Sequence, residues 1–298
     1  MTRAALLRLI LALVSFSLVS SARAVAEIVV APSAEWLMAS SDIVVRGKIT
    51  DVTIALSKNR EAWDKVTVKV TETLRGKHQD TIDFVVQQPS GEFSTQHLRQ
   101  FIGGGDVLLF LVKGDAHKKT GPEQFADVVL TPHEETQPYD LSGKYPFAVP
   151  NLEFKVMSRP DDLLTLVQKI AKENPATEKT KRLTVHVPFE TDAFRKLWGG
   201  SSVLLTAPAN PHLEGLAKAW LESKKLEYRT IGVRALGEFK SDANIKLLKS
   251  LLASPDSEEI TSNGKQLRHY PLRHYAFEAL ERWGVQVQRP VTDEPRDC

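Results

Sequence analysis

The sequence predicts an α+β multidomain protein, with an antiparallel β-barrel or β-sandwich over residues 27–157 and an α-helical repeat over residues 208–285. Three observations support this fold class. Residues with alternating apolar and polar character dominate the first half, apolar residues at helical spacing dominate the second half, and two late segments align with each other without gaps.

The chain begins with the three parts of a secretory signal peptide. Arg3 and Arg8 are positively charged, residues 9–19 are uncharged and mostly apolar, and small residues then form a small-x-small cleavage pattern. This apolar core has about half of the roughly 20 residues that a membrane-spanning helix needs. We therefore expect residues 1–24 to be removed, with cleavage after residue 26 as the alternative, and a mature protein in the periplasm or outside the cell without membrane insertion.

The charge of the mature chain argues against nucleic acid as a partner. Loss of Arg3, Arg8 and Arg23 changes the formal net charge from +2 to −1. A nearly neutral chain has no general attraction for nucleic acid or anionic lipid. The single cysteine, Cys298, allows no intrachain disulfide, so we expect burial of apolar residues to stabilise the fold.

The first half has the pattern of short antiparallel strands. In residues 63–74, Val66, Val68 and Val70 alternate with polar residues, which is the period of a half-buried strand. Trp63 begins this strand among charged residues, and we expect it to be exposed. Glycine and charged turn residues separate the segments, as in a barrel or sandwich. Further strands are expected at residues 42–53, 81–86, 106–112 and 125–130, and short helices at residues 33–40 and 95–101.

Helical spacing begins after residue 157. Leu163, Val167 and Ile170 are spaced as on one face of a helix over residues 160–172. We expect residues 158–207 to form a connector and residues 286–298, which contain two prolines, to form a flexible tail. Besides this helix, the connector is expected to contain strands at residues 183–187 and 203–206 and a short helix at residues 192–197.

Two segments near the end of the sequence resemble each other. Residues 231–239 align with residues 275–283, so that Ala235 coincides with Ala279, an offset of 279 minus 235, or 44 residues. An amphipathic helix is expected before each segment, at residues 211–223 and 242–254. The sequence therefore predicts two antiparallel helix pairs, with an insertion over residues 255–270.

On these residues, the C-terminal part resembles a HEAT-like helical repeat, whose units have a period of about 40–47 residues. Residues 233–243 are its most typical stretch. Residues 41–112 more faintly resemble the netrin-like, OB-type β-barrel found in the tissue inhibitors of metalloproteinases and in uncharacterised exported bacterial proteins. The resemblance is carried by residues 41–49, 68–77 and 105–111. Those inhibitors use an N-terminal cysteine amine and several disulfides, which this chain lacks, so the resemblance implies a fold and no inhibitory chemistry.

The sequence contains no recognisable catalytic, cofactor-binding or metal-binding constellation. It has no Gly-x-Ser-x-Gly motif and no phosphate-binding loop. His269 and His274 are separated by Pro271, so we expect them not to share a helix face. We therefore predict no metal, no cofactor and no enzymatic activity. No pair has a usual metal-ligand spacing among the eight histidines: His78, His97, His117, His133, His186, His212, His269 and His274.

These expectations favour an exported, non-catalytic protein that binds another protein as a scaffold or adaptor. Both resembled modules commonly present binding surfaces, although a fold does not fix a function. The alternative is a glycan- or small-ligand-binding module that uses the barrel face, and an enzyme of unrecognised type is third. Exposed aromatic or apolar side chains on the helices would favour the adaptor, and a deep cleft beside the barrel would favour the ligand.

Overall fold

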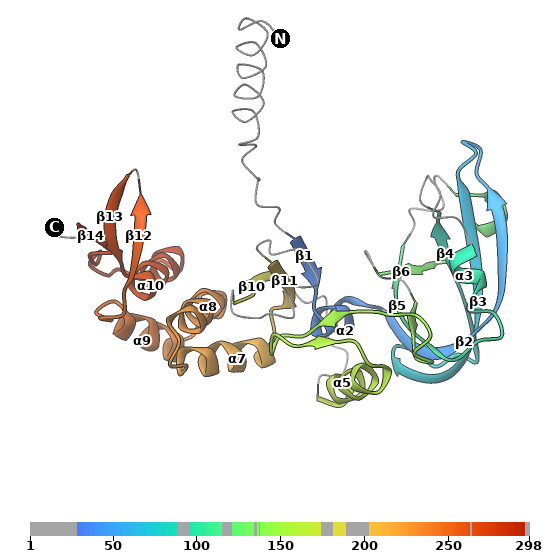
Figure 1. The fold of residues 1–298 in the computed structure, drawn as a ribbon, viewed down its shortest axis with the longest axis horizontal. Coiled ribbons are helices and arrows are strands. Elements are labelled where there is room, and N and C mark those ends of the chain that lie inside the picture. The colour runs from blue at the N-terminus through green and yellow to red at the C-terminus, as the bar shows by residue number, and fades with distance from the viewer. Residues whose placement is uncertain are drawn as a thin grey trace, which may run out of the picture.

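The computed structural model describes residues 29–88, 96–114, 121–133, 136, 138–173, 181–188, 203–262 and 264–295. The molecule is elongated, with a curved antiparallel sheet at one end, a small sheet in the middle and helices at the other end (Figure 1). The structure is thus mixed α and β with several antiparallel sheets, as the sequence predicts. The expected signal peptide, the expected helix at residues 192–197 and Cys298 lie outside the described residues.

The curved sheet has the strand order β4-β3-β2-β5-β6, with β7 paired beside β5, and every pairing is antiparallel. The short helices α3 (Gln96–Arg99) and η1 (Glu123–Phe125) lie in its connections. Its strands are β2 (Ile43–Leu56), β3 (Ala62–Arg75), β4 (Thr81–Gln87), β5 (Val107–Lys113), β6 (Leu130–Pro132) and β7 (Tyr139–Asp140).

Three register shifts between β2 and β3 curl this sheet, because each irregularity bends the strand and increases its twist. Gly47 lies at one of them, where an added Cβ would come within 2.6 Å of the Lys69 carbonyl oxygen. The sheet curls until β4 approaches β6, but these edge strands are not paired in the part of the chain that the structure describes.

The prediction of a closed β-barrel is therefore wrong for this sheet. The strand expected at residues 125–130 is instead the short helix η1 followed by β6, which begins only at Leu130. A strand of three residues offers few main-chain groups for pairing on its second side, so the curled sheet stays open.

Both faces of strand β5 are buried. Leu109 and Leu111 contact the inner core of the curved sheet. Leu108 and Phe110 point the other way, into a core that contains α2 (Ala34–Ser40) and α5 (Pro160–Glu173). Burial on both faces explains why the sequence of this strand is almost continuously apolar.

Trp63 is buried, with 5% of its surface exposed, so the prediction that it is exposed is wrong. Its ring packs with Val85, Phe125 and Val128 in a small cluster. The last two residues come from the segment around η1, far along the chain. Local charge around Trp63 could not reveal this tertiary contact.

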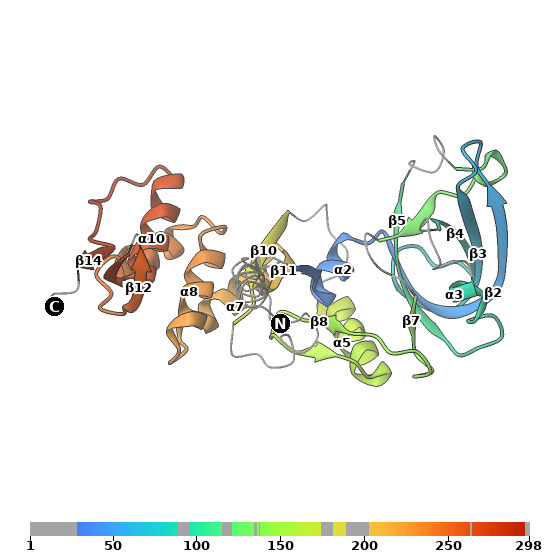
Figure 2. The same cartoon turned by 45° about the horizontal axis from the view of Figure 1, so that its top comes forward.

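A three-stranded sheet occupies the middle of the molecule. β1 (Val29–Pro32) is parallel to β11 (Val203–Pro208), which is antiparallel to β10 (Arg182–His186). Strands β10 and β11 confirm two predictions for the connector. In both views β10 lies on the side of this sheet that faces the C-terminal helices (Figures 1 and 2). A hairpin of β8 (Val149–Pro150) and β9 (Val156–Met157) lies nearby.

Four C-terminal helices are present as expected. Side chains of Asn210 and Ser241 cap the first turns of the first and third helices. The expected insertion is a hairpin of β12 (Glu258–Ser262) and β13 (Lys265–His269). The helices are α7 (Pro211–Leu221), α8 (Leu226–Leu236), α9 (Asp242–Leu251) and α10 (Pro271–Arg282).

The helices share one apolar core with the middle sheet. Val185 and Leu205 of the strands belong to the same buried cluster as Leu213, Leu236 and Leu280 of the helices. The helices are therefore held against strand β10, and this packing positions the groove described below. The sequence-based domain boundaries stay predictions.

Part of the expected flexible tail is ordered as a strand. β14 (Asp293–Pro295) pairs with β13, and the carbonyl oxygen of Thr292 accepts a hydrogen bond of 2.9 Å from the Tyr270 N–H. Pro295 stands at the end of this edge strand, where its missing N–H costs little. The described part of the tail is thus anchored on the hairpin.

Candidate functional site: a groove along strand β10

A cavity of about 470 Å³ separates the outer edge of β10 from helices α8 and α10. We call this cavity and the strand edge beside it the β10 groove. One strand and two helices line it: Leu183, Thr184 and Val185 from β10, Arg234, Ala235 and Glu238 from or just after α8, and Tyr275, Glu278, Ala279 and Arg282 from α10.

Strand β10 presents unpaired main-chain groups to the groove. Strand β10 pairs with β11, so that Leu183 lies opposite Ala207 and Val185 lies opposite Leu205. Just beyond them, the Val187 N–H donates a hydrogen bond of 2.9 Å to the Val203 carbonyl oxygen. The direction of the N–H and C=O groups alternates along an antiparallel strand. Those of Leu183 and Val185 therefore point toward β11, and those of Thr184 point outward. The same holds for His186. Neither residue has a main-chain partner on its outer side among the described residues.

The cavity lining carries two arginines and two glutamates, and Lys181 lies beside it as a third cation. Glu238 forms ion pairs with Lys181 at 2.7 Å and with Arg282 at 2.9 Å, so two cations share one carboxylate. Glu278 lies 3.3 Å from the ring nitrogen of His274. Arg234 instead stacks over an aromatic ring, and no carboxylate of the described chain forms an ion pair with it. With Lys181 included, cationic side chains at the groove therefore outnumber carboxylates by one.

His186, at the other end of the groove, responds to this charge. Its pKa is lowered from the usual value of an imidazole, mainly because burial disfavours the charged ring and secondly because Arg234 repels a proton. His186 is thus neutral at pH 7. A second small hollow is lined by His186, Ile231 and Arg234, so the groove extends along β10 from Leu183 to His186.

The sequence similarity between α8 and α10 builds the helical wall. At the offset of 44 residues, Arg234 corresponds to Glu278, and Ala235 corresponds to Ala279. Glu238 likewise corresponds to Arg282, with which it forms an ion pair. Equivalent positions of the two aligned segments therefore face the same cavity, with small residues at the centre and opposite charges on either side.

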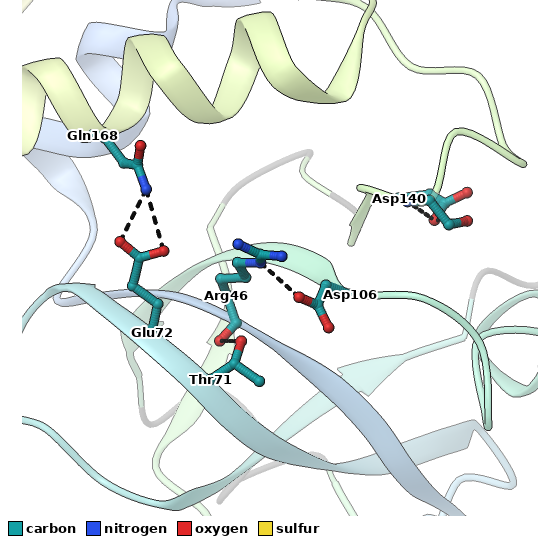
Figure 3. Close-up of polar contacts among 7 residues, drawn as sticks. Arg46, Thr71, Glu72, Asp106, Asp140 and Gln168 are labelled. Carbon is teal, nitrogen blue, oxygen red and sulfur yellow. Dashed lines mark hydrogen bonds and ion pairs between the residues drawn. The ribbon is translucent and has the colours of Figure 1, made fainter.

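A second polar cluster joins the curved sheet to helix α5 and has a structural explanation. Figure 3 shows Gln168 of α5 pointing toward Glu72 of β3, with a shortest hydrogen bond of 3.0 Å. Arg46 extends from β2 to Asp106, just before β5, at 2.6 Å. Asp140 lies apart and accepts hydrogen bonds from the turn that follows it, which lower its pKa although burial raises it. These contacts connect secondary-structure elements.

Among the described residues, Ser40 and His133 resemble a nucleophile and base in contact, a pair that the sequence does not reveal. Ser40 Oγ lies 2.6 Å from His133 Nε2. The hydroxyl donates to the Trp36 carbonyl oxygen, so Nε2 carries the proton that it shares with Oγ. In this tautomer Nε2 is not a base, and the pair connects α2 to the segment after β6.

The structure brings His269 and His274 together, with ring centroids 5.7 Å apart, although the prolyl residue between them suggested separation. His269 Nδ1 donates a hydrogen bond of 2.8 Å to the carboxylate of Asp293 in β14. No group of three potential ligand residues could hold a metal ion within the described residues. Of the other histidines in the sequence, His117 and the side chain of His97 lie outside the described residues.

Comparisons with protein-family models, with curated proteins and with solved structures found no match to this chain. Within the described ranges, no helix combines the length and the apolar character needed to cross a membrane.

The sequence did not predict the β10 groove, because its residues are far apart along the chain. Its strand and helices each gave a local signal, but Thr184 and Arg234 are far apart in the sequence. The only available clue was the alignment of residues 231–239 with residues 275–283, which identified equivalent helix positions without showing that they face a strand edge.

Proposed function

We propose that this chain is an exported, non-catalytic scaffold or adaptor that binds another protein through the β10 groove. The observation that supports this function best is an open strand edge beside a helical wall in which Arg234 stacks on Tyr275. Strand edges and aromatic side chains are common elements of protein recognition.

The proposal includes the finer fold assignments. We assign α7 to α10 to a short HEAT-like repeat and the curved sheet to a netrin-like, OB-type fold that is open at one edge. The contacts of α7 with α8 and of α10 with α9 support paired helices. The shared core with the middle sheet supports helices that cap against the connector, because two repeat pairs alone are too few to be stable.

Export is part of the same proposal. Residues 1–24 have the charge, apolar core and small residues of a signal peptide. The partner would then be a protein of the periplasm or the cell exterior. A glycan or small ligand remains the alternative class, and the position of the β10 groove beside helices, away from the curved sheet, makes us place it second.

The proposal is tested by affinity isolation of the chain, produced in its own host from residue 1, followed by mass spectrometry of what binds. We expect one stoichiometric partner that is captured by the chain and by Lys249→Gln, an exposed control charge on α9. Arg234→Gln should capture less of it. A folded chain that captures no protein in repeated experiments would overturn the adaptor.

A further inference from the structure

The β10 groove also indicates what kind of segment the partner contributes, an inference that rests on the proposed function. We propose that an extended, acidic segment of the partner adds to β10 as a new edge strand, with its carboxylate side chains against Arg234. The middle sheet would then change from order β1-β11-β10 to four strands.

The main-chain geometry sets the form of this segment. Thr184 and His186 both direct their N–H and C=O groups away from β11, at the open edge of the sheet, and they are two residues apart. An extended strand presents matching groups at the same interval, whereas a helix satisfies its own main-chain groups internally. Strand β10 has five residues, so a partner segment of about that length would cover the edge.

The charges of the groove set the composition of the segment. The cavity lining balances Arg234 and Arg282 against Glu238 and Glu278, and Lys181, which contacts Glu238 from beside the cavity, adds a third cation. Glu238 is already shared by two of these cations. A basic segment would meet the remaining positive charge of Arg234, whereas an acidic segment would neutralise it.

Arg234 is well placed to bind a carboxylate. Its guanidinium lies over the Tyr275 ring, 4.9 Å from the centroid, and this cation–π contact restrains the position of the group. An arginine fixed in this way can donate two parallel hydrogen bonds to one carboxylate. Arg234 therefore provides selectivity, and β10 provides the general affinity for an extended chain.

A second copy of this chain fits the edge less well. Antiparallel pairing of two β10 strands about Thr184 would place Arg182 of one copy opposite His186 of the other, close to its Arg234. The Arg182 guanidinium, which lies 5.8 Å from the Trp36 ring centroid, would then add positive charge on the side of Arg234 of the other copy, which is unfavourable. Self-association is thus an outcome of the test and not the expected occupant.

The test uses two capped peptides with the same alternating pattern, Thr-Val-Glu-Val-Glu-Val-Thr and Thr-Val-Lys-Val-Lys-Val-Thr, titrated into the purified full chain. We expect the acidic peptide to bind at least about tenfold more tightly than the basic one at low salt, and the difference to shrink as salt screens the charges. Equal affinity of the two peptides would overturn the acidic preference. Dimerisation without peptide binding would overturn the proposed occupant.

Two substitutions separate main-chain pairing from charge. Thr184→Pro removes only the outward N–H of an edge strand, a position where proline is tolerated, and should abolish binding of the acidic peptide. Thr184→Val keeps the N–H and should bind normally. Arg234→Gln should weaken the acidic peptide about tenfold and leave the basic peptide unchanged, whereas Lys249→Gln should change neither. Normal binding by a folded Thr184→Pro chain contradicts strand addition.

The circular dichroism spectrum and unfolding midpoint of each variant establish that it is folded. The failure of this inference can be told apart from the failure of the adaptor function. If Thr184→Pro captures the natural partner as well as the unsubstituted chain does, the adaptor function stands and the β10 groove is not where the partner binds. If the unsubstituted chain captures no partner, the adaptor function itself fails.

Discussion

Arg234 of helix α8 lies over the ring of Tyr275 of helix α10, with the guanidinium carbon 4.9 Å from the ring centroid. The contact joins the two helices whose sequences align at an offset of 44 residues, and it stands in the wall of the β10 groove. Because Arg234 also acts on His186 across the groove, the charge of the groove can be measured without any ligand.

Removal of this charge should raise the pKa of His186. In Arg234→Gln the repulsion that opposes protonation is lost, while the larger effect of burial remains. The pKa should therefore rise toward, but not reach, the ordinary value of a histidine. An NMR titration of the His186 ring measures this pKa. Lys249→Gln, which keeps the charge of Arg234, is the control and should leave the pKa unchanged. A fall in the pKa would contradict the proximity of the two residues.

The buried carboxyl group of Glu35 should make the protein less stable as the pH rises. Glu35 is 5% exposed, and its oxygens lie 3.2 Å from the Leu152 N–H. Desolvation by burial raises its pKa from 4.5 to about 7, although hydrogen bonds from Leu152 and Ser33 lower it. Between these two values the folded state holds more protons than the unfolded state, so the free energy of unfolding decreases with rising pH.

The loss through this window is about 3 kcal/mol as an order of magnitude. Glu35→Gln should therefore flatten the profile between pH 4.5 and 7, as measured by urea unfolding at several pH values. Part of the slope should remain, because burial also raises the pKa of Asp64 to about 6. The exposed control Glu258→Gln should keep the full slope. An unchanged slope in Glu35→Gln would show that Glu35 titrates normally.

Loss of the Phe154 ring should destabilise the joint between the β8–β9 hairpin and the helices. The ring is 4% exposed and stacks on Trp220 with centroids 5.1 Å apart. Phe154→Ala removes this buried contact and leaves a cavity, with an expected cost of about 3–5 kcal/mol in the free energy of unfolding. Chemical denaturation measures the loss. Val291→Ala, at a position that is 56% exposed, should cost less than about 0.5 kcal/mol.

Two glycines should respond to alanine in opposite directions. At Gly47 a new Cβ would lie 2.6 Å from the Lys69 carbonyl oxygen, so Gly47→Ala should destabilise the chain by about 1–3 kcal/mol. At Gly215, inside α7, a Cβ meets nothing within 4 Å, and Gly215→Ala should stabilise it by about 0.5–1 kcal/mol. Thermal unfolding of both variants checks the signs. Destabilisation by Gly215→Ala would contradict the open space beside that residue.

Local patterns predicted secondary structure well wherever one face of an element is buried. The strand over residues 63–74 and the helix over residues 160–172 match β3 and α5 closely. The errors arose where distant residues decide the outcome. Trp63 is covered by Phe125 and Val128, which no local window contains.

The β10 groove also depends on contacts between distant residues that local patterns do not predict. No pattern in residues 183–187 distinguishes an edge strand from a central one, since side-chain alternation is the same in both. The order β1-β11-β10 makes β10 the edge, and that order depends on the parallel pairing of β1 with β11, which are far apart in the sequence.

The sequence by itself determined the long strands and helices, such as β3 and α5, and which helix positions are equivalent, because periodicity and capping are local properties of the chain. Only the tertiary structure decided that the curved sheet stays open, that Thr184 faces an unpaired edge and that Arg234 lies across from it. These features depend on pairings and contacts between distant residues, and their free energies are set by packing that local spacing does not encode.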